Sequence, residues 1–481
     1  MRFTMPLVTA VTLATLTANA SAEVILEEVI VTATKRAESL QDVPVAVTAF
    51  TADTIQEAGI NDASDLAIMT PSLTANANTT PFTTRLQIRG IGTSQTDPAL
   101  EPSVGMFVDG VFFGRSGLGT SDLTDIARIE VLQGPQGTLY GKNTNAGAIS
   151  IITKRPNLEE YEGYVEATVG DYSMGRLTAA VSGPLGDNLG FRLSGNIHQR
   201  DGYYDNAGVD DLNDADDWNA QGKLLWEPTD RLSLLLRAVH VDRDSTCCGA
   251  DAVQDDTVNQ ELINQGFSPD KNDPYDYDVA TDWEDGFEMD SDLVSLHIDY
   301  DTDWGTITSI TAWNDYDYSS NYDADRSQLD VFRVANEENS GDSFSQELRL
   351  DSSFGDNIDY MVGLFYYDQT TERGDKTPSA FIGEDFINIA NQQGLGIPFA
   401  LVAQPGDYLS YQNTWDNETI AVFGQATWHI GQRWHLTGGL RWTDEEREAD
   451  LFSETFSTAP LAPLGRAFLN SVSTPIDASL D

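Results

Sequence analysis

The chain has 481 residues, with 27 Lys and Arg against 77 Asp and Glu, and a formal net charge of −50. Its length exceeds that of an ordinary single domain. The acidic excess argues against nucleic-acid binding, because such a protein needs Lys and Arg to neutralise phosphate. The composition also argues against disorder, since 40% of the residues are hydrophobic and 10% are aromatic, which is enough to fill a packed structure.

The N-terminus has the form of a secretory signal peptide over residues 1–22. Arg2 is followed by an apolar run from Met5 to about Ala18, and the run ends in Ala18-Asn-Ala-Ser-Ala22, which offers two Ala-x-Ala cleavage sites. A membrane helix is the alternative, but the run is shorter than the ~20 residues that span a bilayer. Because no other segment resembles a membrane helix, we expect any membrane insertion to occur as a β-barrel.

A short β-prone segment follows at residues 28–33, with the sequence Glu-Val-Ile-Val-Thr-Ala, and polar, flexible sequence comes after it. A free segment of this kind can add to the sheet edge of a partner protein as an extra strand. The alternative is an ordinary first strand of the next domain.

Residues 39–155 indicate one mixed α/β domain. The two expected helices have stop signals, Gly59 after the first and Pro71 after the second. From Asp125 to Lys154, two apolar runs surround a glycine-rich turn, as in a small β-domain whose backbones approach closely. The expected strands are 43–50, 85–90, 104–110, 126–132 and 148–152, and the expected helices are 51–58 and 62–69.

From about residue 160 the sequence alternates with the period of two that β-strands require. In the clearest example, residues 433–442, aromatic and aliphatic side chains share one face, and Arg, His and Thr side chains share the other. A soluble β-sandwich also alternates, but aromatic residues cluster at these strand ends and the opposite face carries charges, which favours a membrane barrel. The pattern predicts about eleven strands, at 161–170, 175–184, 189–200, 218–227, 230–242, 291–301, 304–318, 342–351, 357–369, 416–430 and 433–447.

Connection lengths are an independent argument for the same architecture. Short turns alternate with long connections at 201–217, 243–290, 319–341 and 370–415. Because alternate connections of an up-and-down barrel lie on the same rim, we expect all long loops on one rim and all short turns on the other. This asymmetry is typical of outer-membrane barrels, whose long loops lie outside the cell.

The segments of residues 39–155, in their order and spacing along the chain, closely resemble the plug domain of TonB-dependent outer-membrane receptors. The segment Glu28, Val29, Ile30, Val31, Thr32 and Ala33 resembles their TonB box. The resemblance implies a mainly β protein, with an α/β plug domain inside an antiparallel transmembrane β-barrel that has about 22 strands in the family. It divides the chain into a signal peptide (1–22), a tether with the TonB box (23–38), the plug domain (39–155) and the N-terminal part of the barrel (160–481).

About half of the barrel strands are then present, and we interpret the chain as an N-terminal fragment. Its last residues, 477–481, are polar where such barrels usually present an aromatic strand. An open half-barrel would leave two unpaired edges in lipid, which should not be stable.

We find no catalytic signature, and the sequence predicts no enzyme, no cofactor and no metal site. Residues 137–143 superficially resemble a phosphate-binding loop, but the first Gly is displaced and Asn143 replaces the hydroxyl residue that would bind Mg²⁺. The five histidines all lie in expected strands, where wall-lining or interfacial positions are the simplest interpretation. Cys247 and Cys248 form either a vicinal disulfide or two free thiols, and we assign them no role.

The acidic loops 201–217 and 243–290 allow three interpretations. We favour solvated loops that repel one another by charge. Divalent cations could instead bridge the loops to lipopolysaccharide, or the negative field could concentrate a cationic substrate. The spacing is not that of a calcium EF-loop, because the central Gly and the closing Glu are absent.

Charged residues in or beside apolar strands are predicted to hold the plug domain in the barrel. They are Arg89, Arg128, Glu130 and Glu347. Glu347 lies on the expected lumen face, so we expect plug arginines to pair with it. Each pair should contribute little energy, because a water-filled lumen screens it.

The resemblance also implies ligand-facing plug loops near 75–84 and 111–120. The candidate ligand contacts there are Phe82, Phe112, Phe113 and Arg115. Packing against the barrel wall is the alternative for the three phenylalanines.

The function implied by the resemblance is TonB-dependent active uptake of a scarce metal chelate, most often a ferric siderophore, across the outer membrane of a Gram-negative bacterium. The implied partners are the TonB energy-transducing complex, the chelate, and outer-membrane lipid with lipopolysaccharide. Cobalamin, haem or a glycan are alternative substrates, and nothing in the loops selects among them. A passive porin is a second alternative, against which the plug domain and the TonB-box-like segment argue.

Overall fold

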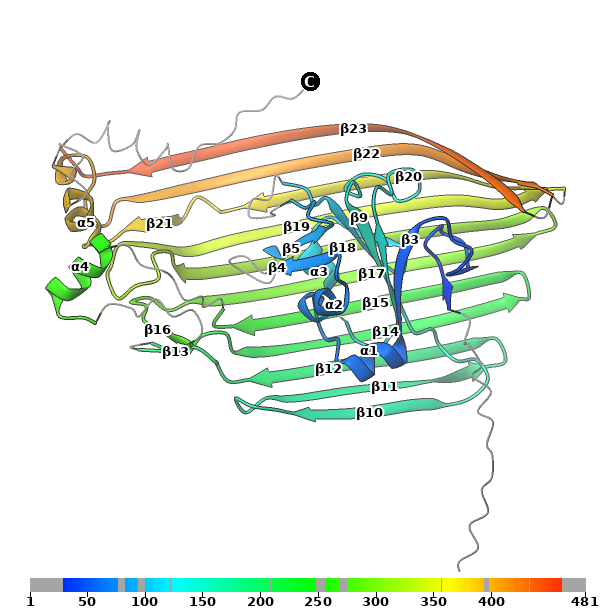
Figure 1. Ribbon diagram of the computed structural model, residues 1–481, viewed down its shortest axis with the longest axis horizontal. Coiled ribbons are helices and arrows are strands. Elements are labelled where there is room, and N and C mark those ends of the chain that lie inside the picture. Colours follow the sequence, from blue (N-terminus) through cyan, green and yellow to red (C-terminus); the bar gives the residue numbers. More distant parts are fainter. Residues whose placement is uncertain are drawn as a thin grey trace, which may run out of the picture.

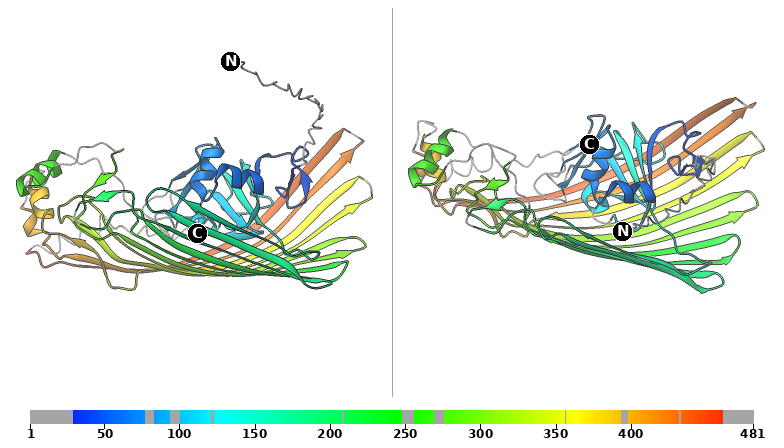
Figure 2. Two further views of the ribbon diagram at one scale, coloured as in Figure 1. Left: turned by 90° about the horizontal axis from the view of Figure 1, so that it is seen from below. Right: turned by 60° about the horizontal axis from the view of Figure 1, so that its bottom comes forward.

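A computed structural model describes residues 29–76, 83–93, 100–120, 123–207, 209–247, 256–268, 276–355, 357–392, 398–431 and 433–460. The expected signal peptide, Glu28, Phe82, Cys248 and residues 477–481 lie outside these ranges. The described chain forms a strongly curved sheet whose concave side holds a smaller mixed domain (Figure 1, Figure 2). No described helix is long and apolar enough to cross a membrane.

The curved sheet has 12 strands, and its long strands pair antiparallel in chain order from β10 to β23. The short β21 (Pro378–Ile382) pairs with both β19 and β22 at one rim. The long strands are β10 (Glu162–Val169), β11 (Gly175–Gly186), β12 (Leu189–Arg200), β14 (Ala215–Thr229), β15 (Leu232–Ser245), β17 (Gly286–Thr302), β18 (Gly305–Asp323), β19 (Phe332–Phe354), β20 (Ile358–Arg373), β22 (Tyr408–Ile430) and β23 (Trp434–Phe456).

Every strand expected between 161 and 447 is confirmed, but the sequence missed β21 and placed several strand ends wrongly. β19 begins at Phe332 rather than at 342, and β22 begins at Tyr408 rather than at 416. At these ends the two faces do not separate into an apolar and a polar one. The period of two therefore disappears although the backbones remain paired.

The two rims of the sheet differ as the connection lengths predicted. One rim has short turns, such as 187–188, 230–231 and 303–304. The other rim, at the left of Figure 1, carries the long connections, with the exception of the short turn 170–174. Cys247 on the long-loop rim is disulfide-bonded, so the alternative of two free thiols is wrong. The elements of the long connections are α4 (Asp256–Gln265), α5 (Phe386–Gln392), the 3₁₀ helix η2 (Phe399–Leu401), β13 (Asp205–Asn206) and β16 (Asp278–Val279).

The plug domain is built on a five-stranded sheet with the order β3-β8-β9-β6-β7. Both expected helices are present, and Gly59 ends the first one with a φ of 67°, as predicted. Thr51 and Asp62, which were expected as the first helical residues, instead cap the two helices with their side chains. The elements are β3 (Ala46–Thr51), β6 (Val104–Val108), β7 (Val111–Phe113), β8 (Ile126–Gln133), β9 (Gly147–Thr153), the hairpin β4 (Leu73–Asn76) and β5 (Arg85–Ile88), and the helices α1 (Ala52–Ala58), α2 (Ala63–Met69) and α3 (Ser116–Thr120).

The main core joins the plug domain to the curved sheet. Buried residues of β6, β8 and β9 pack in one cluster with Val239, Ile310 and Tyr316 of the sheet. The inward positions of the sheet therefore face the plug domain. The N-terminal strands β1 (Ile30–Val31) and β2 (Glu38–Ser39) pair with each other and lie toward the short-turn rim (Figure 2).

Candidate functional site

Glu130 of β8 holds the N-terminal segment against the plug domain. The backbone N–H of Thr32 donates to both carboxylate oxygens, at 2.8 and 3.0 Å, and the Thr32 hydroxyl lies 3.1 Å from Oε1. Arg128 Nε lies 2.7 Å from the same oxygen, and the Glu130 side chain is 0% exposed. A buried charge requires both a counter-charge and hydrogen-bond donors, and Glu130 has both.

Apolar packing also docks this segment. Val31 and Ala33 are buried in a cluster with plug residues. The Tyr140 hydroxyl donates to the carbonyl oxygen of Thr32 at 3.3 Å, and burial together with the charge of Glu130 raises the pKa of Tyr140, so the hydroxyl keeps its proton. The segment is therefore docked, and the prediction of a free segment is wrong for this structure.

The residues that follow contact the curved sheet. Lys35 Nζ forms an ion pair with Glu347 on β19, and Arg36 Nε lies 2.9 Å from Asp351 Oδ1. Arg349 donates to Glu347 Oε1 at 3.0 Å. One short stretch of chain thus binds both the plug domain and the curved sheet around it, which forms the wall of the barrel.

The predicted pairing of plug arginines with Glu347 is wrong. Arg89 is exposed, and its guanidinium contacts Gln133 at 3.3 Å. Arg128 serves Glu130 within the plug domain. Glu347 instead pairs with Lys35, a residue of the expected tether that no local pattern singles out.

Asp109 of the plug domain faces two cations of the curved sheet. Its Oδ2 lies 3.7 Å from Lys223 Nζ and 3.6 Å from Arg237 Nε, and these side chains are 1% and 4% exposed. The N–H of Thr153 donates to Asp109 Oδ1 at 2.9 Å. Burial by itself raises the pKa of Asp109, but the Lys223 and Arg237 charges and the Thr153 bonds outweigh it, so the pKa is lowered.

A tight turn directs Asp109 at these cations. Asp109 and Gly110 join β6 to β7 with φ values of 48° and 83°, the positive values that a two-residue hairpin requires. A Cβ atom on Gly110 would lie 2.8 Å from Ile310 Cδ1, so the turn presses directly on β18. The sequence contained this turn signal, but nothing local indicated which strands it meets.

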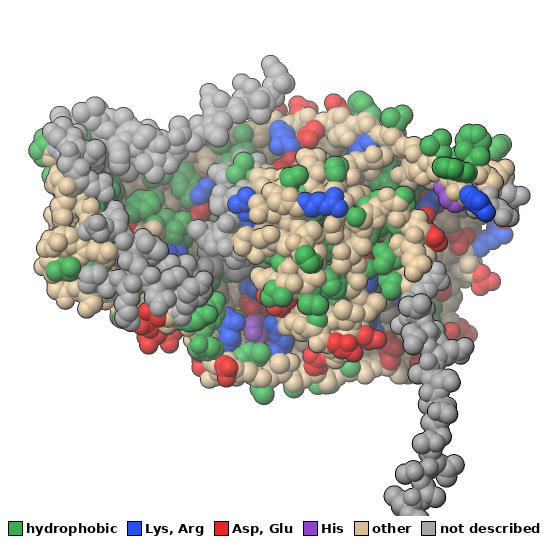
Figure 3. Space-filling model, viewed as in Figure 1, with side chains coloured by type: hydrophobic (Ala, Val, Ile, Leu, Met, Phe, Trp, Pro, Cys, Tyr) green, Lys and Arg blue, Asp and Glu red, His purple; other side chains and the backbone are tan. Residues whose placement is uncertain are grey.

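Two further plug carboxylates bind cations in the same way. Asp125 Oδ1 accepts from Arg192 at 2.6 Å, and Glu101 accepts from Arg447 at 2.6 Å. Glu101 also binds Lys142 at 2.9 Å, so a lysine of the loop that resembled a phosphate site has a structural partner. Acidic and basic side chains are interspersed where the plug domain meets the sheet (Figure 3).

The residues predicted to contact a ligand are not accessible in this arrangement. Phe112, Phe113 and Arg115 are 6%, 7% and 3% exposed. The Phe112 ring packs 5.4 Å from the ring of Tyr367 on the wall, and Arg115 donates to the Leu100 carbonyl oxygen at 3.2 Å. Packing against the wall therefore describes the two phenylalanines better than ligand contact, and Phe82 lies outside the described residues.

Comparison with known families identifies this arrangement. The TonB-dependent Receptor Plug Domain matches residues 39–148, and the TonB dependent receptor-like beta-barrel matches residues 249–469. The chain belongs to the TonB-dependent receptors. The receptor is therefore a protein of the outer membrane of a Gram-negative bacterium. The proteins to which it is similar are named as receptors rather than as enzymes.

Several individual proteins are similar to the receptor. The pesticin receptor of Yersinia pestis is 26% identical over 428 residues, which cover 87% of this chain and 56% of that protein. The ferripyoverdine receptor of Pseudomonas aeruginosa is 30% identical over 175 residues, which cover 36% of this chain and 20% of that protein. The crystal structure of the ferric yersiniabactin uptake receptor FyuA from Yersinia pestis aligns with a TM-score of 0.68 at 22% identity, over 85% of this chain and 61% of that chain. The chain spans about half the length of the first curated relatives.

The ion pair of Lys35 and Glu347 should help to hold the docked segment of the receptor. Replacing Glu347 by glutamine removes the charge that both Lys35 and Arg349 contact, and a hydrogen bond to a charged group contributes about 1.5–3 kcal/mol. The measurement uses a cysteine placed at the buried position Ala33, in a protein without its native cysteines. In Glu347→Gln we expect this cysteine to react about 10-fold faster with a thiol reagent than it does with Glu347 present. Glu337→Gln, the same change on the same strand beside Arg373, is the control. Equal labelling rates would show that Glu347 does not hold the segment.

Proposed function

We propose that the receptor performs TonB-dependent active uptake of a scarce metal chelate, a ferric siderophore, across the outer membrane. The observation that carries the proposal is the contact of one short segment with both parts of the molecule. Thr32 binds the plug domain through Glu130, and Lys35 and Arg36 bind the wall a few residues later. A force applied to residues 28–33 therefore acts on the plug domain and on its attachment to the wall together.

We infer that Glu28, Val29, Ile30, Val31, Thr32 and Ala33 form the TonB box. Such a segment pairs with TonB as an added strand, through its backbone N–H and C=O groups. The N–H of Thr32 is already bound by Glu130, so the segment has to leave the plug domain before it can pair. The pulling force then acts on the ion pairs of Lys35 and Arg36 and afterwards on the plug domain itself. No covalent bond is made or broken by this chain.

The siderophore class is supported by similar proteins whose names refer to ferripyoverdine and ferric yersiniabactin. The ligand is proposed to bind between the plug domain and the long-loop rim. Outer-membrane lipid and lipopolysaccharide are the proposed partners of the outward face. Cobalamin, haem or a glycan remain the alternative substrates.

Growth of a deletion strain on a panel of ferric chelates tests this function. We expect loss of iron-limited growth on one chelate, and the same loss when TonB is absent or the proton-motive force is collapsed. Normal growth on every chelate would contradict the siderophore assignment and favour cobalamin, haem or a glycan. Uptake that continues without TonB and without the proton-motive force would instead identify a passive porin.

A further inference from the structure

The outward side of the curved sheet changes from apolar to acidic along its strands. On β15, Val239 and Val241 are buried toward the plug domain, so the alternating residues face outward. Taken from the short-turn rim to the long-loop rim, these outward residues are Leu234, Leu236, Ala238, His240, Asp242 and Asp244. The acidic part therefore begins where the apolar, lipid-facing belt ends.

Acidic residues of neighbouring strands face one another across this region. The strand register places Asp242 opposite Asp290 and Asp292 opposite Asp315. It also places Asp315 opposite Asp342. We call these five residues the outer carboxylate row. Like charges directly opposite each other on adjacent strands are destabilising, so a bound cation would stabilise the row.

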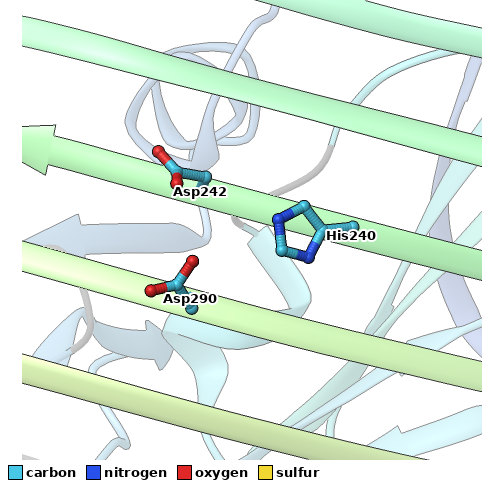
Figure 4. Close-up of side chains that lie close together, drawn as sticks. All are labelled: His240, Asp242 and Asp290. Carbon is cyan, nitrogen blue, oxygen red and sulfur yellow. The ribbon is translucent and has the colours of Figure 1, made fainter.

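His240 adds a donor of a different kind at one end of this row. One nitrogen of its ring and one carboxylate oxygen each of Asp242 and Asp290 lie within 4.8 Å of one another. Figure 4 shows the three side chains turned toward one another from the adjacent strands β15 and β17. One imidazole and two carboxylates at this spacing form a donor set that suits a divalent transition-metal ion.

Two neighbours hold the His240 ring in the orientation that a metal ligand needs. Its Nδ1 lies 3.0 Å from Asp292 Oδ1, and its centroid lies 4.9 Å from the ring centroid of Trp218. A histidine that binds a metal almost always donates its second ring N–H to a carboxylate, a carbonyl or water, which directs the other nitrogen at the ion. With Nδ1 beside Asp292, Nε2 is the nitrogen that remains for the cation.

We propose that His240, Asp242 and Asp290 bind one divalent transition-metal ion, whose open coordination positions take phosphate oxygens of the outer-leaflet lipids. Three protein donors leave at least one position of such an ion open. The phosphate part rests on the proposed function, because it takes the long-loop rim to lie outside the cell. Because the site lies at the edge of the apolar belt, on the side of the long-loop rim, it lies beside the lipid headgroups. Cation bridging, which the sequence suggested for the loops, is thereby assigned to the ends of two strands.

A hollow beside the site provides room for a phosphate group. It has a volume of about 310 Å³, and Asp290 belongs both to the hollow and to the His240 cluster. Its other acidic lining residues are Glu288, Asp317, Glu338, Glu372 and Asp375. These carboxylates would repel a phosphate group unless cations bind first, so metal binding should precede phosphate binding.

Mn²⁺ titration of the detergent-purified receptor, followed by the EPR signal of the free ion, tests the metal site. We expect one site that His240→Asn and Asp290→Asn each weaken about 10-fold or more, since even substitutions outside the ligand set cost 10- to 100-fold. Asp342→Asn, the same carboxylate-to-amide change elsewhere in the outer carboxylate row, should keep the affinity. Equal Mn²⁺ affinity in wild type and His240→Asn overturns the site. Thermal unfolding checks each variant, and His240→Gln replaces His240→Asn if the latter does not fold.

Phosphorus-31 relaxation tests the phosphate ligand and its source. With Mn²⁺ bound, we expect line broadening of lipid A phosphate that is lost in His240→Asn. Broadening of inorganic phosphate but not of lipid A would overturn the lipid assignment, and no broadening in either case would overturn the phosphate ligand. These results are separate from the chelate-growth assay, because the site can bind Mn²⁺ whether or not the receptor transports iron.

Discussion

Replacing Glu130 by glutamine should release the N-terminal segment from the plug domain. The carboxylate accepts from the N–H and hydroxyl of Thr32 and pairs with Arg128, and hydrogen bonds to a charged group contribute about 1.5–3 kcal/mol each. An amide is neutral and has a single acceptor oxygen, so the ion pair and at least one of these bonds are lost. We expect the ratio of docked to released segment to fall about 10- to 100-fold, since 1.4 kcal/mol corresponds to a factor of ten.

A nitroxide label at position Ile30 measures this release, because the side chain there is 43% exposed and leaves room for the label. Glu130→Gln should narrow the EPR lines and should increase binding of the purified TonB partner in the absence of ligand. Glu166→Gln is the matched control, because it makes the same change at an exposed position on β10. An unchanged line shape in Glu130→Gln would contradict the role of Glu130 in docking the segment.

Replacing Asp109 by asparagine should loosen the plug domain in the barrel. Lys223 and Arg237 are both buried, and without Asp109 their charges lose this partner. Removing one member of a buried ion pair typically costs about 3–5 kcal/mol, because the other member stays desolvated. Asparagine is the appropriate replacement, since it tolerates the positive φ of 48° at this position and keeps an oxygen for Thr153.

The Asp109→Asn substitution should lower the midpoint of thermal unfolding of the purified receptor. It should also raise the sensitivity of cells to a large antibiotic, because the antibiotic can enter past a loosened plug domain. Asp53→Asn is the control, because Asp53 is an exposed plug carboxylate. Adding Lys223→Met to Asp109→Asn removes one unpaired charge and should restore part of the stability. If the single variant is as stable as wild type, the Asp109 cluster does not anchor the plug domain.

The pH dependence of the same unfolding gives a second check on Asp109. Its pKa is lowered in the folded receptor, so its contribution is complete above the unfolded pKa of about 4 and is lost as the pH falls through the folded value. Wild type should therefore lose stability in acid more steeply than Asp109→Asn. Parallel pH profiles would show that the Asp109 charge does not contribute to the folded state.

Local features of the sequence determined most of the elements of this receptor. Alternation with a period of two located the long strands, because each residue of a strand faces either the plug domain or the outside. Gly59 and Pro71 located the ends of the two helices, because each constrains the backbone within a few residues of itself. Neither signal exists at the start of β19 or throughout β21, so the sequence did not predict a strand there. The structure nevertheless pairs these residues with neighbouring strands.

Only the tertiary structure decided which charges meet. The sequence singled out Glu130 and Glu347 as charges in apolar strands, but it assigned the wrong partner to Glu347 and did not foresee that Glu130 binds Thr32. Lys35 and Glu347 are 312 residues apart, and Thr32 and Glu130 are 98 apart. Any lysine attracts any carboxylate, so attraction alone does not select a pair. The curvature of the sheet around the plug domain selects it, and that curvature is the sum of many strand twists and registers that no short segment contains.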